Sequence, residues 1–202
     1  MPSRWELVHI HSQLGNDHLG NTLTDPGYRL KEETTPTARS SQIELALSPV
    51  VTVSKQNLAN DLATLGILYA KTNREQHPSI EDFMLHNDSS TIACETPIYL
   101  LPDEQRFFTT RGFSLTLPPT VTPVTGHIDL LQLRGGLIYI LNYKPDAIKI
   151  RPVSQLLTYA LAMASRTRLP LKYFKCAWSD EKDYFEFFPI HLVYKKQDRS
   201  AH

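Results

Sequence analysis

A hairpin signal near the middle of the chain constrains its fold more than any other feature. Residues 127–133 and 137–143 are two apolar segments, and Arg134-Gly135-Gly136 joins them. A Gly-Gly pair between two apolar runs is a strong signal for a tight turn, because both glycines can adopt a positive φ. We therefore expect two adjacent antiparallel strands in the core.

The elements after this hairpin predict the fold class. Pro145 ends the second strand, and apolar residues at helical spacing predict a helix over 153–166. Residues 173–179 and 184–189 then predict a second hairpin. The order hairpin, helix, hairpin predicts an α/β fold in which helices flank a central mixed β-sheet.

The sequence before the first hairpin predicts two helices and two strands. Leucine spacing indicates a helix over 57–71 with Ser54 as its N-cap, and a second, short helix is expected from Ser79. Strands are expected over 96–101 and 113–117. The buried face of the first helix would consist of Leu58, Leu62, Leu65, Leu68 and Tyr69.

These elements indicate one main domain with an extension at each end. We expect 1–52 to be an amino-terminal extension that is partly loop, because 14–41 is rich in Gly, Asn, Thr, Pro and Ser. Residues 53–194 would form the domain, and 195–202 a polar tail. A chain of 202 residues can bury enough surface to fold without disulfides or a structural metal.

The cysteine content and the lack of membrane or signal segments predict an intracellular protein. Cys94 and Cys176 lack partner histidines at zinc-finger spacing, so they are expected to be reduced thiols. No apolar run approaches the roughly 18 residues of a membrane span, and the first residues lack a signal-peptide core. We therefore expect a cytoplasmic protein.

The formal net charge is zero, but basic residues gather in one stretch. Residues 144–175 contain seven lysines and arginines and a single acid, Asp146. Such a block is typical either of a surface that faces phosphates or of a solvated helix face. The candidates for contact with nucleic acid are Arg151, Arg166, Arg168 and Lys172.

Three polar residues interrupt the two apolar segments at positions suited to metal chemistry. Asp129 lies in the first strand, and Asn142 and Lys144 lie at the end of the second, two residues apart and so on one face. Phosphodiester hydrolysis needs a divalent cation that polarises the phosphoryl group and activates water. Carboxylate and amide oxygens suit Mg²⁺ or Mn²⁺, and a nearby lysine can neutralise charge or orient the water.

The following helix adds a pair of polar residues on one side. Gln155 and Tyr159 are four residues apart, so both can reach the same site. Together, Gly126-x-x-Asp129, Asn142-x-Lys144 and Gln155-x-x-x-Tyr159 resemble the motifs of the PD-(D/E)XK nuclease superfamily, in its RecB-like branch. The resemblance covers about 95–189 and implies a restriction-endonuclease-like core, Mg²⁺ or Mn²⁺ as cofactor, and DNA as substrate.

The resemblance also implies a catalytic set and an upstream acidic ligand. The catalytic residues would be Asp129, Asn142, Lys144, Gln155 and Tyr159, with Asp129 and Asn142 as metal ligands. The upstream ligand would be Glu95, Glu81 or Asp82, of which we favour Glu95. Asn142 departs from the superfamily pattern, which has Asp or Glu at that position.

Asn142 leaves more than one function open, because an amide lacks the charge that attracts a divalent cation. Either a carboxylate has been replaced and an inactive nuclease trapped, or the chain is a natural member that binds nucleic acid without cutting it. The intact Lys144 favours the first account. The alternatives are a nuclease-like binding module that uses the basic stretch, and a structural subunit of a larger complex or a homo-oligomer.

Overall fold

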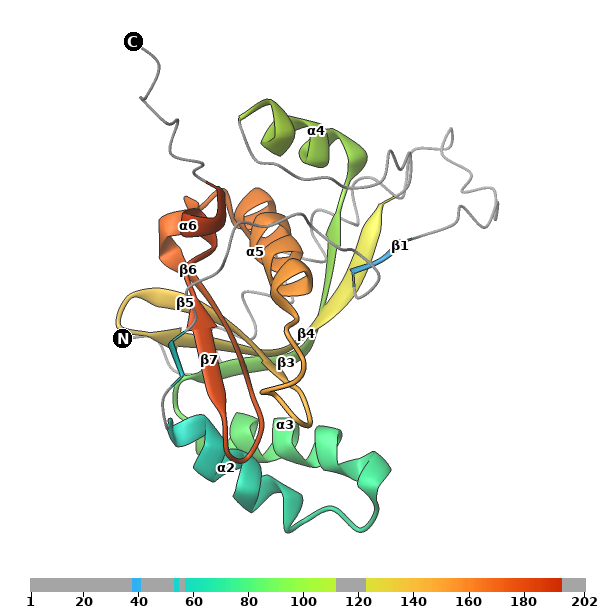
Figure 1. Ribbon diagram of the computed structural model, residues 1–202, viewed down its shortest axis with the longest axis vertical. Helices are drawn as coiled ribbons and strands as arrows, with labels where there is room; N and C mark the ends of the chain where they lie inside the picture. The colour runs from blue at the N-terminus through green and yellow to red at the C-terminus, as the bar shows by residue number, and fades with distance from the viewer. Residues whose placement is uncertain (1–37, 41–52, 55–56, 112–122, 194–202) are drawn as a thin grey trace, which may run out of the picture. The chain divides into compact units, whose positions relative to one another are not determined.

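The computed structural model describes residues 38–40, 53–54, 57–111 and 123–193, and Figure 1 draws these parts in colour. They form an α/β fold in which helices flank a mixed sheet of seven strands. This confirms the predicted fold class. The strands are β1 Ala38–Arg39, β2 Val53–Ser54, β3 Thr91–Leu100, β4 Val124–Arg134, β5 Leu137–Tyr143, β6 Phe174–Ser179 and β7 Tyr184–Phe187.

The strand order is β1-β4-β5-β6-β7-β2, with β3 on the other edge of β4. The pairs β3–β4, β4–β5, β6–β7 and β2–β7 are antiparallel, whereas β5–β6 and β1–β4 are parallel. Both predicted hairpins are confirmed. In the first hairpin, Gly135 and Gly136 have φ values of 54° and 77°, which an L side chain would disfavour.

The helices cover both faces of the sheet, and each face has its own apolar core. Figure 1 shows α5 on one side and α2 with α3 on the other. The helix α5 connects β5 and β6, and a connection between parallel strands needs such a crossover. The helical segments are α2 Leu58–Ile67, η2 Asn73–Glu75, α3 Gln76–Asn87, α4 Pro102–Thr110, α5 Val153–Thr167, η3 Leu171–Tyr173 and α6 Pro189–Val193.

The predicted buried face of α2 was wrong. Four of its five expected residues are between 45 % and 75 % exposed: Leu58, Leu65, Leu68 and Tyr69. The helix instead buries a face of mostly small side chains, together with Leu62. Packing against α3 explains this choice, because a Cβ at Gly66 would lie only 2.8 Å from Ile80 Cα.

Both helix starts also differ from the prediction. Asn57, not Ser54, is the N-cap of α2, since its side chain accepts a hydrogen bond from the Ala59 N–H at 3.1 Å. The helix α3 begins at Gln76 rather than Ser79, after the short turn η2. Pro78 is tolerated because the first helical turn leaves its N–H groups without intrahelical partners. This earlier start places His77 on the helix.

The strand β3 begins at Thr91, five residues before the predicted start, and the expected strand 113–117 lies outside the described residues. The sheet also takes in β1, which belongs to the expected amino-terminal extension. Within the described ranges, none of the helices combines the length and the apolar character that crossing a membrane would require.

Candidate metal centre

Side chains along a strand normally alternate between the two faces of the sheet. In β3 and β4 this alternation is interrupted at neighbouring positions. Leu131 and Ile128 belong to the core under α5, whereas Leu130 between them belongs to the core under α2 and α3. Strict alternation would place Leu130 and Ile128 on one face, so Asp129 acts as an extra residue. Glu95 is the extra residue of β3, since Cys94 pairs with Leu130 and Thr96 with Ile128.

The backbone of Glu95 records this irregularity. Its φ is 46°, in the left-handed region that a residue other than glycine rarely adopts inside a strand. Backbone strain of this kind costs on the order of 1–3 kcal/mol and tends to gather at functional sites. The face change therefore brings two carboxylate residues, Glu95 and Asp129, to opposing positions on neighbouring strands.

The carboxylate of Asp129 is buried and has three neighbours from other elements. Its Oδ2 accepts a hydrogen bond from the Tyr143 N–H at 3.0 Å. The same oxygen lies 3.2 Å from His77 Nε2 and 3.7 Å from Lys144 Nζ. The motif residues Asp129 and Lys144 thus meet as the sequence predicts, and His77 of α3 joins them.

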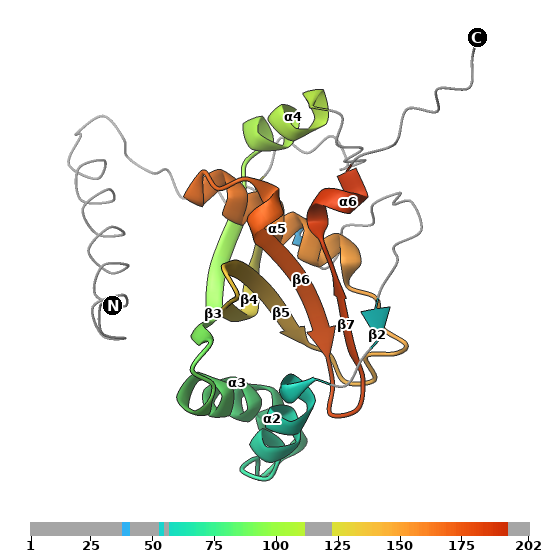
Figure 2. The ribbon, with the colours of Figure 1, turned by 90° about the vertical axis from the view of Figure 1, so that its left-hand side faces the viewer.

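The helix α3 contributes a second carboxylate next to His77. Glu81 lies one turn after His77, and its Oε1 is 2.8 Å from His77 Nε2. Figure 2 shows α3 beside the end of the sheet where β3 begins. The ring of His77 also packs edge-on against Tyr143, whose hydroxyl donates a hydrogen bond to Glu181.

The two carboxylates change the protonation of His77. The nearby carboxylates of Asp129 and then of Glu81 raise the pKa of His77 from 6.5 to about 10, although burial opposes the shift. Burial raises the pKa of Glu81, and His77 partly offsets this. His77 is therefore a cation at neutral pH and neutralises the acidic group.

Three side chains in this region could hold a metal ion together. One ligand atom each from His77, Glu81 and Glu95 lie within 4.8 Å of one another. A bound cation would take the place of the proton on His77, because imidazole binds metals only in its neutral form. The donor set of one nitrogen and two carboxylates suits Mn²⁺ better than Mg²⁺, which prefers oxygen ligands alone.

Asn142 adjoins this group through its main chain. The ladder between β4 and β5 ends at the pair of Leu130 with Leu141, and Asp129 and Asn142 are the next residues along each strand. The side chain of Asn142 is fully buried, and neither its Oδ1 nor its Nδ2 has a hydrogen-bond partner among the described residues. Strand alternation places this side chain with Ile140 on the face under α5, whereas Leu141 and Tyr143 face α2 and α3.

Gln155 and Tyr159 brace α5 over β4. The Gln155 side chain donates to the Tyr159 hydroxyl at 2.8 Å, and the Ser40 hydroxyl donates to the same oxygen at 3.0 Å. Gly126 makes room for this contact, since a Cβ there would lie 2.7 Å from the Tyr159 hydroxyl. Burial raises the pKa of Tyr159, and the charge of Asp129 adds to this effect.

Acidic residues partly neutralise the predicted basic surface, and all of them except Asp146 come from other parts of the chain. Lys144 lies near Asp129, Lys149 pairs with Asp146, and Lys175 pairs with Glu186. Among the four candidates for contact with nucleic acid, Arg166 pairs with Glu104 at 2.6 Å. Arg151, Arg168 and Lys172 are exposed, and no acidic partner is found for them within the described ranges.

Sequence reasoning missed His77 and considered Glu81 only as an alternative to Glu95. The signal was present, since a His-x-x-x-Glu spacing places both side chains on one helix face. It was hidden by the assumption that Pro78 precedes the helix, which puts His77 in a loop. Asp82, the other alternative, is an exposed residue that contacts His86 and lies outside the acidic group.

Comparison with known proteins adds no assignment. No protein-family model matches the chain, and no curated protein matches its sequence at a significant level. Neither comparison therefore places the chain in the nuclease superfamily that its motifs resemble.

Proposed function

We propose that the chain is a metal-dependent DNA nuclease with a restriction-endonuclease-like core. The observation that carries the proposal is the convergence of His77, Glu81 and Glu95 beside Asp129 and Lys144. These residues come from a helix and three consecutive strands or strand ends, and the motif residues among them meet in space. A rigid base of this kind suits catalysis by an ion.

The ion would be held by His77, Glu81 and Glu95, with Asp129 as the fourth candidate ligand. The imidazole favours Mn²⁺ among the two cations that the sequence suggests. When bound, such an ion polarises a phosphoryl oxygen and lowers the pKa of a water molecule. Two partners already orient the Asp129 carboxylate, the Tyr143 N–H and His77, which is typical of a ligand set fixed before binding.

Lys144 would act next to the ion rather than on it. Its ammonium group lies 3.7 Å from Asp129 Oδ2 and is partly exposed, so it can approach a phosphate from the solvent side. In that position it neutralises negative charge that develops on the phosphate and orients the attacking water. Gln155 and Tyr159 hold α5 against β4 and so keep Gly126 and Asp129 in place.

Asn142 limits the activity of the chain as it stands. A carboxylate in this position would add a negative charge next to Asp129, whereas the amide offers only a neutral oxygen. We expect weak cleavage by the present sequence and stronger cleavage by Asn142→Asp.

The test is cleavage of labelled single- and double-stranded DNA with Mn²⁺, with Mg²⁺ and with a chelator. Asn142→Asp should cut in a metal-dependent manner, and adding Glu81→Gln should remove most of that activity. Asp82→Asn is the control, since Asp82 lies beside Glu81 on α3 but is 75 % exposed. If folded Asn142→Asp cuts neither substrate with either metal, the proposal is wrong.

A nuclease-like module that binds nucleic acid without cutting it is the second candidate function. The neutral Asn142 favours it, as do three exposed cations without acidic partners in the described part of the chain: Arg151, Arg168 and Lys172. This candidate predicts salt-sensitive DNA binding in the presence of a chelator. Binding that does not change with salt, or that survives neutralisation of all three residues, would exclude it.

A further inference from the structure

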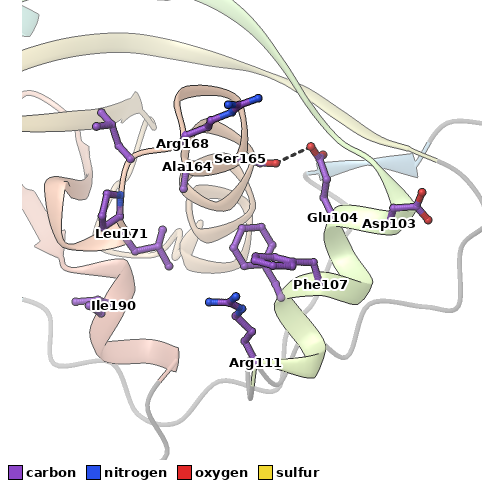
Figure 3. A pocket seen from close by; sticks show the side chains of 12 residues that line it. Asp103, Glu104, Phe107, Arg111, Ala164, Ser165, Arg168, Leu171 and Ile190 are labelled. Carbon is purple, nitrogen blue, oxygen red and sulfur yellow. Dashed lines mark hydrogen bonds between the residues drawn. The ribbon is translucent and has the colours of Figure 1, made fainter.

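A large hollow lies away from the metal centre, between α4, the end of α5, η3 and α6. Its cavity volume is about 1050 Å³, slightly above the range of pockets that hold small molecules, roughly 300–1,000 Å³. Apolar side chains form most of its wall, and Phe107 is half exposed. Figure 3 shows Phe107 on one side of the hollow and Leu171 with Ile190 on the other.

The charge balance of this hollow is positive. Its two acids are already paired with arginines that do not line it: Asp103 with Arg106, and Glu104 with Arg166. The two arginines that line it, Arg111 and Arg168, have no acidic partner among the described residues. Figure 3 shows the guanidinium of Arg111 in the hollow and that of Arg168 pointing outward at its rim. An anionic ligand inside would therefore meet Arg111, and one that extends over the rim would meet Arg168.

The hollow also combines an aromatic face with one of these cations. The guanidinium of Arg111 lies 4.5 Å from the centre of the Phe107 ring, and Figure 3 shows it in the space between Phe107 and Ile190. A flat ring can stack on this pair, as nucleobases do on aromatic side chains and guanidinium planes. Chemistry that offers a base and a phosphate together therefore fits the site.

Arg168 occupies its position at a cost. It ends α5 in the left-handed conformation, with φ 57°, where helices usually place glycine. A charged side chain is thus held in a strained conformation at the rim of the hollow. Observed strain of this kind is a reason to look for function.

We propose that the hollow binds an unpaired stretch of a DNA strand, with a base on Phe107 and Arg111 and the backbone phosphate near Arg168. The inference rests on the proposed function, because it supplies the substrate preference of the same enzyme. Arg168 lies about 14 Å along α5 from Tyr159, which packs against Gly126 of β4. The hollow lies on the face of the sheet that α5 covers, whereas α3, which carries His77 and Glu81, covers the other face. A longer strand would therefore reach the metal centre around the edge of the sheet.

The contacts between α4 and α5 give the site a fixed shape. Ser165 donates to Glu104 Oε1 at 2.6 Å, a bond that Figure 3 marks, and Arg166 binds the other oxygen of Glu104. Arg166 also stacks on Tyr99 of β3, with its guanidinium 4.1 Å from the ring centre. Phe107 and Arg168 are thus held on elements joined through Glu104.

Fluorescence anisotropy in a chelating buffer tests this inference without cleavage. The probes are a labelled thymidine strand of about twelve nucleotides and an abasic strand of the same length. Phe107→Ala should weaken binding of the thymidine strand at least about fivefold and leave the abasic strand nearly unchanged. Arg111→Gln and Arg168→Gln should each lower the salt dependence, with a slope change of about 0.7.

Arg74→Gln is the control, because it removes the same charge from a residue that does not line the hollow. Its binding should match that of the parent chain. The inference is overturned if Phe107→Ala and Arg168→Gln bind the thymidine strand as tightly as the parent chain does. It is also overturned if thymidine monophosphate binds as tightly as the strand. The binding assay contains no metal, so its result does not depend on cleavage. If the chain binds the strand here but never cuts DNA, only the proposed function is refuted.

Discussion

Gly126→Ala should destabilise the protein, although replacing glycine in a strand usually does the opposite. Gly126 is not among the residues with positive φ, so alanine can adopt its backbone conformation. On the unfolded-state effect alone, the substitution would stabilise by about 0.4–1 kcal/mol. The sign of the change therefore depends on what the added methyl group meets.

The structure predicts that it meets the Tyr159 ring and its hydrogen-bond network. The new Cβ would lie 2.5 Å from Ser40 Oγ, 2.6 Å from Tyr159 Cε1 and 2.7 Å from the Tyr159 hydroxyl. Tyr159 is almost fully buried, so it cannot move into solvent. Overpacking costs about 1–3 kcal/mol, and loss of the Gln155 or Ser40 hydrogen bond adds about 1 kcal/mol. After subtraction of the unfolded-state effect, we expect a net loss of about 1–3.5 kcal/mol.

Urea unfolding of four proteins measures this coupling: the parent chain, Gly126→Ala, Tyr159→Leu and the double variant. Tyr159→Leu removes the atoms that the methyl group would hit, so Gly126→Ala should cost much less in that background. The interaction free energy between the two positions should exceed about 1 kcal/mol. Additive effects, or a Gly126→Ala variant as stable as the parent chain, would refute this explanation of the Gly and Tyr motif positions.

Three further substitutions test other parts of the structure. Asn142→Asp should lower the melting temperature of the metal-free protein, because it buries a carboxylate beside Asp129. In the same thermal unfolding assay, Mn²⁺ at 100 times its Kd should raise the free energy of unfolding of this variant by about 2.7 kcal/mol. Asp88 has its pKa held below 3.8, since hydrogen bonds from Ser90 and Thr91 and the charge of Arg134 outweigh the effect of burial. The ionised Asp88 therefore contributes to the free energy of unfolding above pH 3.8, and this contribution is lost as pH falls through the lower folded pKa. Asp88→Asn should lower the free energy of unfolding by about 1–2 kcal/mol at pH 7. It should also flatten the decline in that free energy below about pH 4. Arg168→Gly should raise the free energy of unfolding by about 0.5–1 kcal/mol, because it relieves the left-handed conformation at the end of α5; an unchanged or lower value contradicts that account.

The central part of the fold could be predicted because its signals are local. The Gly135-Gly136 turn fixes the first hairpin, and the helix that follows has a clear apolar stripe. The buried face of α2 could not be predicted in the same way. Its choice depends on how closely Ile80 of another helix approaches Gly66, which hydrophobic spacing within α2 does not record.

The candidate site was predictable in part for the same reason. Asp129 and Lys144 are near in sequence and lie on paired strands, so their meeting follows from the hairpin. His77 and Glu81 reach the site through the packing of α3 on the sheet, about fifty residues away along the chain. The face change at Glu95 and Asp129 is likewise a property of the paired strands and leaves no pattern in either one.

The central claim is that His77 and its acidic neighbours bind a divalent cation. Electron paramagnetic resonance of the Mn²⁺-loaded protein measures this directly, because a coordinated imidazole gives a nitrogen coupling to the metal. We predict one bound Mn²⁺ with this coupling, lost in His77→Gln and retained in His86→Gln, an exposed histidine on the same helix. Absence of a bound ion, or a nitrogen coupling that persists in His77→Gln, would contradict the account.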